Sequence, residues 1–163
     1  MFVTHLECPQ CDAQFVSEEK QQLCHCGSPL LVRYDLEKIR QSMDKDVVAR
    51  RAPDLWRYRE LLPVLSDENI VTMGEGMTPI LKLDRMGLDL GMTHLYLKDE
   101  GVIPTGTFKA RGATVGVSRA KELGVKTLAM PTNGNAGGAW AQYCAKAGIE
   151  AVVVMPKNAP VIP

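Results

Sequence analysis

The sequence predicts an α/β fold in which helices cover both faces of a parallel sheet, preceded by a small cysteine-rich segment. Strand-like and helix-like segments alternate between His94 and Met155, which gives two successive strand–helix–strand crossovers. Four of the five cysteines lie within the first 26 residues. A chain of 163 residues is long enough for one domain with a substantial core.

Charge and hydropathy favour a protein that acts on small molecules. The chain carries 19 basic and 19 acidic residues without a long run of one sign, so we expect neither nucleic acid nor an anionic membrane as a partner. No apolar run is long enough to span a membrane, and the N-terminal residues MFVTHLECPQ lack the basic and then apolar pattern of a signal peptide. We therefore expect a cytoplasmic protein whose cysteines stay reduced.

Residues 1–34 are predicted to form a zinc-ribbon-like segment. Its cysteines form a C-x2-C pair and a C-x-C pair: Cys8, Cys11, Cys24 and Cys26. Four thiolates suit the tetrahedral corners of a structural zinc site, and a closed site of this kind leaves no position for a substrate. Because the C-x-C spacing is tight, His25 or His5 could occupy one corner instead. The alternative is a ribbon with free thiols that folds without metal.

Residues 28–34 alternate in polarity and are expected to form the closing strand of this ribbon. Residues 35–72 are expected to form a helical linker region. Asp35 is a suitable N-cap for a helix over residues 36–43, whereas residues 46–53 are charged and without periodicity. Within residues 54–65, the helical spacing of Leu55, Tyr58, Leu61 and Leu62 then predicts a helix that Pro63 stops.

Residues 73–163 contain the segments of the predicted α/β domain. These are a loop leading into a strand (73–81), a strand (94–100), an amphipathic helix (108–124), a strand covered on both faces (127–130), a helix ended by Gly148 and a buried strand (151–155). The inward face of the first helix is expected to carry Ala113, Val117, Ala120 and Leu123. Cys144 is expected to be a small core residue.

Lys109 stands where a turn becomes a helix, in the segment PTGTFKARG (residues 104–112). A lysine acts as a nucleophile only when neutral, and the positive end of a helix dipole and the nearby cation of Arg111 both favour the neutral form. Phe108 supplies apolar cover beside the amine. From these local features alone, the alternative is a solvated surface lysine.

The segment PTNGNAGGAWA (residues 131–141) joins a strand to a helix through a glycine-rich loop. Such a loop lets backbone amides approach an anion closely, although it is also often only a tight connection. Lys109 and Asn135 each follow a predicted parallel strand. Because ligands of such sheets bind beyond the carboxyl ends of the strands, we expect Lys109 and Asn135 to line one crevice.

Lys98-Asp99-Glu100 followed by PTGTFKARG is similar to the cofactor-lysine signature of the tryptophan synthase β-subunit family, the fold type II pyridoxal phosphate (PLP) enzymes. The resemblance implies that Lys109 forms the Schiff base with PLP and that Phe108 lies beside the cofactor. It also implies that Asn135 hydrogen-bonds the phenolic oxygen of PLP. The expected contacts to the substrate carboxylate are Thr132, Asn133 and Ala136.

Within that family, the cysteine segment, GEGMTPI (residues 74–80), PTGTFKARG and TNGNAGG (residues 132–138) together most resemble the threonine synthases. The resemblance implies a PLP-dependent lyase that converts O-phosphohomoserine into threonine and phosphate, with an amino acid as substrate. Threonine dehydratases are the alternative, because they share both central motifs and often carry Lys-Ala-Arg, as at Ala110. A non-catalytic zinc-ribbon interaction module is a further alternative.

The family binds the PLP phosphate through a glycine-rich loop, and no GGGxG-like run occurs in these residues. We therefore expect an incomplete fold type II domain, either the N-terminal portion of a longer enzyme or a truncated product, that binds PLP poorly and turns over little by itself. Residues 155–160, MPKNAP, resemble the family's step into a further helix. For the full-length enzyme the resemblance allows a homodimer.

Overall fold

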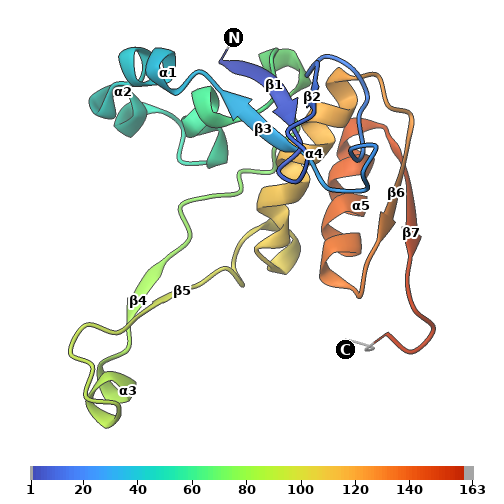
Figure 1. The fold of residues 1–163 in the computed structure, drawn as a ribbon. Helices are drawn as coiled ribbons and strands as arrows, with labels where there is room; N and C mark the ends of the chain where they lie inside the picture. The colour runs from blue at the N-terminus through green and yellow to red at the C-terminus, as the bar shows by residue number, and fades with distance from the viewer. Residues whose placement is uncertain (1, 160–163) are drawn as a thin grey trace.

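The structure is a computed structural model that describes residues 2–159. Two helices, α4 (Lys109–Glu122) and α5 (Asn135–Ala147), pack side by side at its centre. The N-terminal segments lie against α4, a two-stranded parallel sheet packs against α5, and a thin arm projects away from the body (Figure 1). The predicted step into a further helix at residues 155–160 ends outside the described residues.

The N-terminal segment is a small antiparallel sheet with the strand order β2-β1-β3. Its strands are β1 (Val3–Glu7), β2 (Gln14–Phe15) and β3 (Leu31–Tyr34). The strand expected within residues 28–34 is confirmed as β3, which pairs with β1 along its whole length.

The linker region is more helical than the sequence predicts. The carboxylate of Asp35 accepts a hydrogen bond from the amide of Lys38 and begins α1 (Leu36–Ser42), as expected. Residues 46–53, expected to be a charged linker stretch without periodicity, contain most of a second helix, α2 (Lys45–Arg50), which Asp44 caps. The helix predicted before Pro63 is a 3-10 helix, η1 (Leu55–Leu61), with a kink at Tyr58, and a short 3-10 turn, η2 (Asp67–Asn69), follows.

The projecting arm consists of β4 (Ile80–Lys82), α3 (Asp84–Asp89) and β5 (Tyr96–Lys98). Strands at both predicted positions, after the loop at residues 73–79 and within residues 94–100, are confirmed. The pairing predicted for the second strand is wrong, however. β5 pairs antiparallel with β4 and does not join the parallel sheet.

The parallel sheet contains only β6 (Thr127–Pro131) and β7 (Glu150–Val154), joined through α5 in one crossover. The α/β class is confirmed, but the prediction of helices on both faces is wrong for residues 2–159. Both long helices lie on the same side of the sheet (Figure 1). Residues 151–154, expected to form a buried strand, are exposed in β7.

The main core lies where α4 and α5 meet. Its buried residues are Val71, Ile103, Ala110, Ala113, Val117, Ala120, Ala139, Tyr143, Cys144 and Ile149. The expected inward face of α4 is therefore confirmed, except that Leu123 is only half-buried. Gly116 permits this packing, because a Cβ atom there would overlap the indole ring of Trp140. No helix within residues 2–159 has the length and apolar character needed to cross a membrane.

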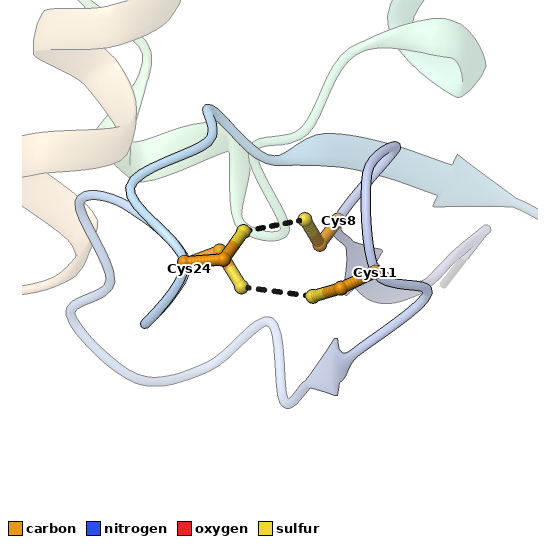
Figure 2. A group of neighbouring side chains, drawn as sticks. Cys8, Cys11 and Cys24 are labelled. Carbon is orange, nitrogen blue, oxygen red and sulfur yellow. Dashed lines mark hydrogen bonds between the residues drawn. The ribbon is translucent and has the colours of Figure 1, made fainter.

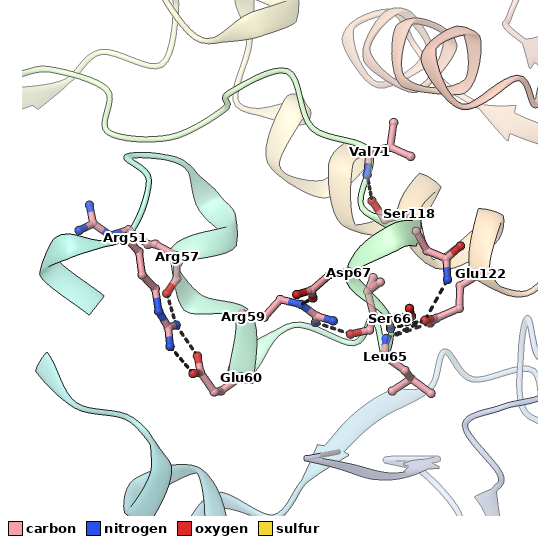
Figure 3. A network of polar contacts seen from close by, with 12 residues as sticks. Arg51, Arg57, Arg59, Glu60, Leu65, Ser66, Asp67, Val71, Ser118 and Glu122 are labelled. Carbon is pink, nitrogen blue, oxygen red and sulfur yellow. Dashed lines mark hydrogen bonds and ion pairs between the residues drawn. The ribbon is translucent and has the colours of Figure 1, made fainter. Parts of the chain in front are cut away.

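A second face of α4 is polar and binds the linker region through hydrogen bonds. The pattern of apolar residues in the sequence does not predict this buried polar face. Thr114 and Ser118 are fully buried. The hydroxyl of Thr114 donates to the carbonyl of Val71 (2.7 Å), and the amide of Val71 donates to the hydroxyl of Ser118 (2.8 Å; Figure 3). One turn further on, Glu122 accepts hydrogen bonds from the amides of Leu65 and Ser66. Thr114, Ser118 and Glu122 are spaced four residues apart, which places them on one face of the helix.

Candidate active site and cysteine cluster

Lys109 opens α4, and a short 3-10 turn, η3 (Pro104–Gly106), ends three residues before it. Thr105 in that turn has a φ of 75°, a left-handed conformation that is costly for a threonine. The hydroxyl oxygens of Thr105 and Thr107 are buried and have no hydrogen-bond partner within residues 2–159. The turn before the lysine is thus strained and carries two unpaired polar groups.

Lys109 and the glycine-rich loop line one cavity of about 400 Å³. The lining brings together five of the predicted site residues: Lys109, Thr132, Asn133, Asn135 and Ala136. Phe108 is not part of the lining. Its side chain is 56% exposed, and the centre of its ring lies 4.3 Å from the Lys109 Nζ atom.

The expected convergence of Lys109 and Asn135 is confirmed, but the expected cause is wrong. Lys109 does not follow a strand of the parallel sheet, because β5 belongs to the arm. The two residues meet because α4 packs lengthwise on α5 with both N-terminal ends at the same end of the layer (Figure 1). Asn135 does lie beyond the carboxyl end of β6, as expected.

The glycine-rich loop presents backbone donors to this cavity. The Oγ1 atom of Thr132 accepts hydrogen bonds from the amides of Gly134 (3.0 Å) and Gly137 (3.1 Å), which folds the loop around that hydroxyl. Gly134 has a φ of 146°, which favours glycine. The amides of Asn135 and Ala136 find no acceptor in the described part of the chain. They are available to an anionic ligand at the positive end of α5.

A network of ion pairs and hydrogen bonds beside Lys109 joins GEGMTPI, Lys98-Asp99-Glu100 and PTGTFKARG. The guanidinium of Arg111 donates two hydrogen bonds to the carboxylate of Glu100, at 2.7 Å and 2.9 Å. The hydroxyl of Thr78 donates to the same carboxylate (2.5 Å), and the Nζ of Lys98 donates to the Thr78 carbonyl (2.5 Å). The network connects the start of α4 to the arm and to the GEGMTPI loop.

This network changes the expected role of Arg111. The sequence suggested an unpaired cation beside Lys109, but the positive charge of Arg111 is matched by Glu100. The hydrogen bonds from Arg111 lower the pKa of Glu100 to about 2, against the opposing effect of burial, and the Thr78 hydroxyl adds to the lowering. The same pairing raises the pKa of Arg111. The sequence pattern does not mark Thr78 or Glu100 as a site residue, although both lie in the quoted motifs.

Glu75 anchors the GEGMTPI loop in the core. Its carboxylate is fully buried and accepts hydrogen bonds from the Thr72 hydroxyl (2.9 Å), the Met73 amide (2.9 Å) and the Tyr143 hydroxyl (2.5 Å). Burial and the bond to Glu75 raise the pKa of Tyr143. The sequence does not predict this burial, because a charged residue between two glycines is typical of an exposed loop.

The four N-terminal cysteines form a separate cluster. Their sulfur atoms all lie within 4.8 Å of one another, close enough to hold one metal ion. The Sγ atoms of Cys11 and Cys24 are 3.5 Å apart (Figure 2). Neither His5 nor His25 belongs to this group. His5 contacts Glu7, and the Nδ1 atom of His25 lies 3.7 Å from the sulfur of Cys24.

The chain belongs to the family of pyridoxal-phosphate dependent enzymes, whose sequence profile matches residues 71–162. Over most of its length it is similar to threonine synthases. The threonine synthase of Methanocaldococcus jannaschii is 38% identical over 151 residues, which cover 93% of this chain and 37% of that protein. The threonine synthase of Methanosarcina acetivorans is 44% identical over 153 residues, with coverage of 93% and 37%. A bacterial threonine synthase, from Halalkalibacterium halodurans, is 41% identical over 104 residues, with coverage of 64% and 29%.

The chain therefore spans 37% of the length of the two archaeal relatives. Both relatives match 93% of the chain, a share that must extend beyond the region of the family profile. The similarity to threonine synthases thus includes part of the residues before Val71, where the cysteine cluster and the linker region lie.

Proposed function

We propose that this protein takes part in the PLP-dependent conversion of O-phosphohomoserine into threonine and phosphate, with Lys109 as the residue that holds PLP. The observation that carries the proposal is the cavity shared by Lys109 and the loop of residues 131–136. Its volume of about 400 Å³ lies within the range typical of small-molecule sites. The choice of this reaction rests on the similarity of the chain to threonine synthases.

The residues present fit the reactive end of PLP. The cavity offers one primary amine, on Lys109, and unpaired amide donors at the start of α5. An amine can condense with an aldehyde, and amide donors at a helix N-terminus bind oxyanions. The printed residues contain no GGGxG-like run for the cofactor's phosphate. We therefore expect these 163 residues alone to hold PLP weakly and to turn over little substrate.

PLP, when bound, supplies an electron sink that stabilises negative charge on the substrate carbons. The protein's own residues then have four tasks. The Lys109 amine removes and returns protons at those carbons as general base and acid. The side chain of Asn135, which lines the cavity, would hold the cofactor through a hydrogen bond to its phenolic oxygen. Thr132, Asn133 and Ala136 bind the substrate carboxylate at the positive end of α5, while Phe108 covers the lysine from outside.

Ala110 does not favour the dehydratase alternative. The Lys-Ala-Arg sequence is what resembles the dehydratases, but Ala110 is fully buried in the core between the helices. It is absent from the lining of the cavity, so it does not select the substrate there. Residues that face the cavity must decide between the threonine synthase and the threonine dehydratase reactions.

Borohydride trapping tests the role of Lys109. The 163-residue chain is incubated with PLP, reduced with borohydride and analysed by peptide mass spectrometry. We expect the label on Lys109 to exceed that on every other lysine, and the variant Lys109→Ala to lose it. The matched control is Lys126→Ala, which removes an exposed lysine outside the cavity and should leave the labelling of Lys109 unchanged. Uniform labelling of surface lysines would contradict the proposal.

The reaction is tested by offering O-phosphohomoserine and threonine separately in the presence of PLP. Formation of threonine and phosphate from O-phosphohomoserine, even at a low rate, supports the threonine synthase reaction. Formation of 2-oxobutanoate and ammonia from threonine as the main activity would show the dehydratase reaction instead. Lys109→Ala should abolish either activity.

A further inference from the structure

The N-terminal cysteine cluster lies outside the candidate active site. We propose that Cys8, Cys11, Cys24 and Cys26 bind one zinc ion, and that this ion holds the loop between the two cysteine pairs against α4. The proposal does not depend on the PLP chemistry.

The sulfur positions match a tetrahedral metal site. Two thiolates that bind zinc at 2.3 Å each lie about 3.8 Å apart when they occupy tetrahedral corners. In the structure the Sγ atoms of Cys8 and Cys26 are 3.5 Å apart, as are those of Cys11 and Cys24, and all four lie within 4.8 Å of one another. Only small side-chain movements are needed to place one ion at equal distance from all of them.

The backbone around the cysteines already has the required turns. The Gly27 amide donates to the Cys24 carbonyl (2.9 Å), and a φ of 85° at Gly27 closes this turn. It brings Cys24 and Cys26 to the same cluster in spite of the C-x-C spacing. In the first pair, the Gln10 amide donates to the Cys8 sulfur (3.4 Å), which holds this turn closed. Four soft sulfur ligands select zinc over the oxygen-binding cations.

The segment has almost no hydrophobic core of its own. Within residues 2–34 the buried residues are Val3, Cys8, Ser17 and Cys24. Two of these four are cysteines of the cluster. Segments this small generally need a disulfide, a metal or a docking partner to stay folded. A zinc ion that cross-links both cysteine pairs would supply that stabilisation.

The loop between the cysteine pairs is docked on α4. Ser17 lies in this loop and is only 4% exposed. Its carbonyl accepts a hydrogen bond from the guanidinium of Arg119, which also pairs with Glu122 in the last turn of α4. Glu122 in turn binds the amides of Leu65 and Ser66. The metal therefore supports, through one buried carbonyl, the end of the helix that begins with Lys109.

Metal analysis of the full chain tests the site. We expect about one zinc per chain after purification under reducing conditions, with all four thiols protected from alkylation. Cys24→Ser and Cys11→Ser should each lower the zinc content at least ~10-fold. The matched control is Cys144→Ser, a buried cysteine in α5 outside the cluster, which should keep its zinc. Replacement of zinc by Co²⁺ should give the absorption bands of a tetrahedral thiolate site.

Three results would overturn the zinc site: free, rapidly alkylated thiols without metal; two disulfides; or iron in place of zinc. The cobalt spectrum of the unmutated chain keeps the test decisive even if a cysteine variant fails to fold. Hydrogen exchange tests the docking. Chelation of zinc should raise amide exchange in residues 12–23 and in the last turn of α4, and Arg119→Gln should do the same while keeping the metal. Unchanged exchange in α4 after zinc removal would overturn the coupling to that helix.

Discussion

The hydroxyl of Tyr143 donates a 2.5 Å hydrogen bond to the carboxylate of Glu75, and both side chains are fully buried. This contact joins α5, whose first residues line the candidate active site, to the GEGMTPI loop that leads into the arm. Because a buried carboxylate must be matched by donors, the pair fixes where the loop can lie.

Removal of this donor should destabilise the protein. We expect Tyr143→Phe to lower the free energy of unfolding by about 2 kcal/mol, because Glu75 would lose one of its buried donors. Tyr58→Phe is the matched control, since Tyr58 is exposed and its substitution should change stability very little. Urea unfolding of both variants measures the effect. Equal stability of the two variants would show that the bond contributes nothing net.

The Glu100–Arg111 pair should make stability depend on pH in the acid range. The folded-state pKa of Glu100 is lowered from its ordinary 4.5 to about 2, so the folded protein binds this proton less readily than the unfolded chain. The stabilisation is thus complete above about pH 5 and is lost as the pH falls through 4.5 towards 2. Glu100→Gln should cost about 2 kcal/mol at pH 7 and almost nothing near pH 2.

Urea unfolding of Glu100→Gln and the unmutated chain across this pH range tests the prediction. Substitution of the exposed Glu18 by Gln serves as a control for a general change in net charge. A difference between Glu100→Gln and the unmutated chain that stays constant from pH 7 to pH 2 would exclude the ion pair as its source.

A substitution at Gly116 should disturb the packing of α4 on α5, whereas a substitution one turn earlier, at Gly112, should not. A Cβ atom at Gly116 would overlap the Trp140 ring, so Gly116→Ala should lower the free energy of unfolding by about 1–3 kcal/mol. Gly112 lies in the same helix with no neighbouring atom within 4 Å of its Cβ position. Gly112→Ala should therefore raise stability by about 0.5–1 kcal/mol, as expected for a helix interior. Thermal unfolding of the two variants compares them directly, and a shift of the same sign for both would contradict this account of the interface.

Local features of the fold followed from the sequence alone. The cap at Asp35, the helix end at Gly148 and the inward face of α4 depend on residues a few positions apart, and the structure confirms all three. Each of the two cysteine pairs was predictable for the same reason, since its members lie within one turn. The two motifs of the candidate active site were visible because glycine, lysine and asparagine occupy characteristic positions at the starts of helices.

The tertiary structure alone decided which segments became neighbours. β5 pairs with β4 and leaves the parallel sheet, a choice that depends on contacts between segments and not on the pattern within either strand. Lys109 reaches the cavity of Asn135 because α4 packs on α5, and Glu75, Thr114 and Ser118 are buried because distant segments supply their hydrogen-bond partners. The sequence by itself thus determined the local conformation of most segments and the chemical groups they carry. Strand pairing, helix packing and buried polar contacts are long-range, so only the folded chain decided them.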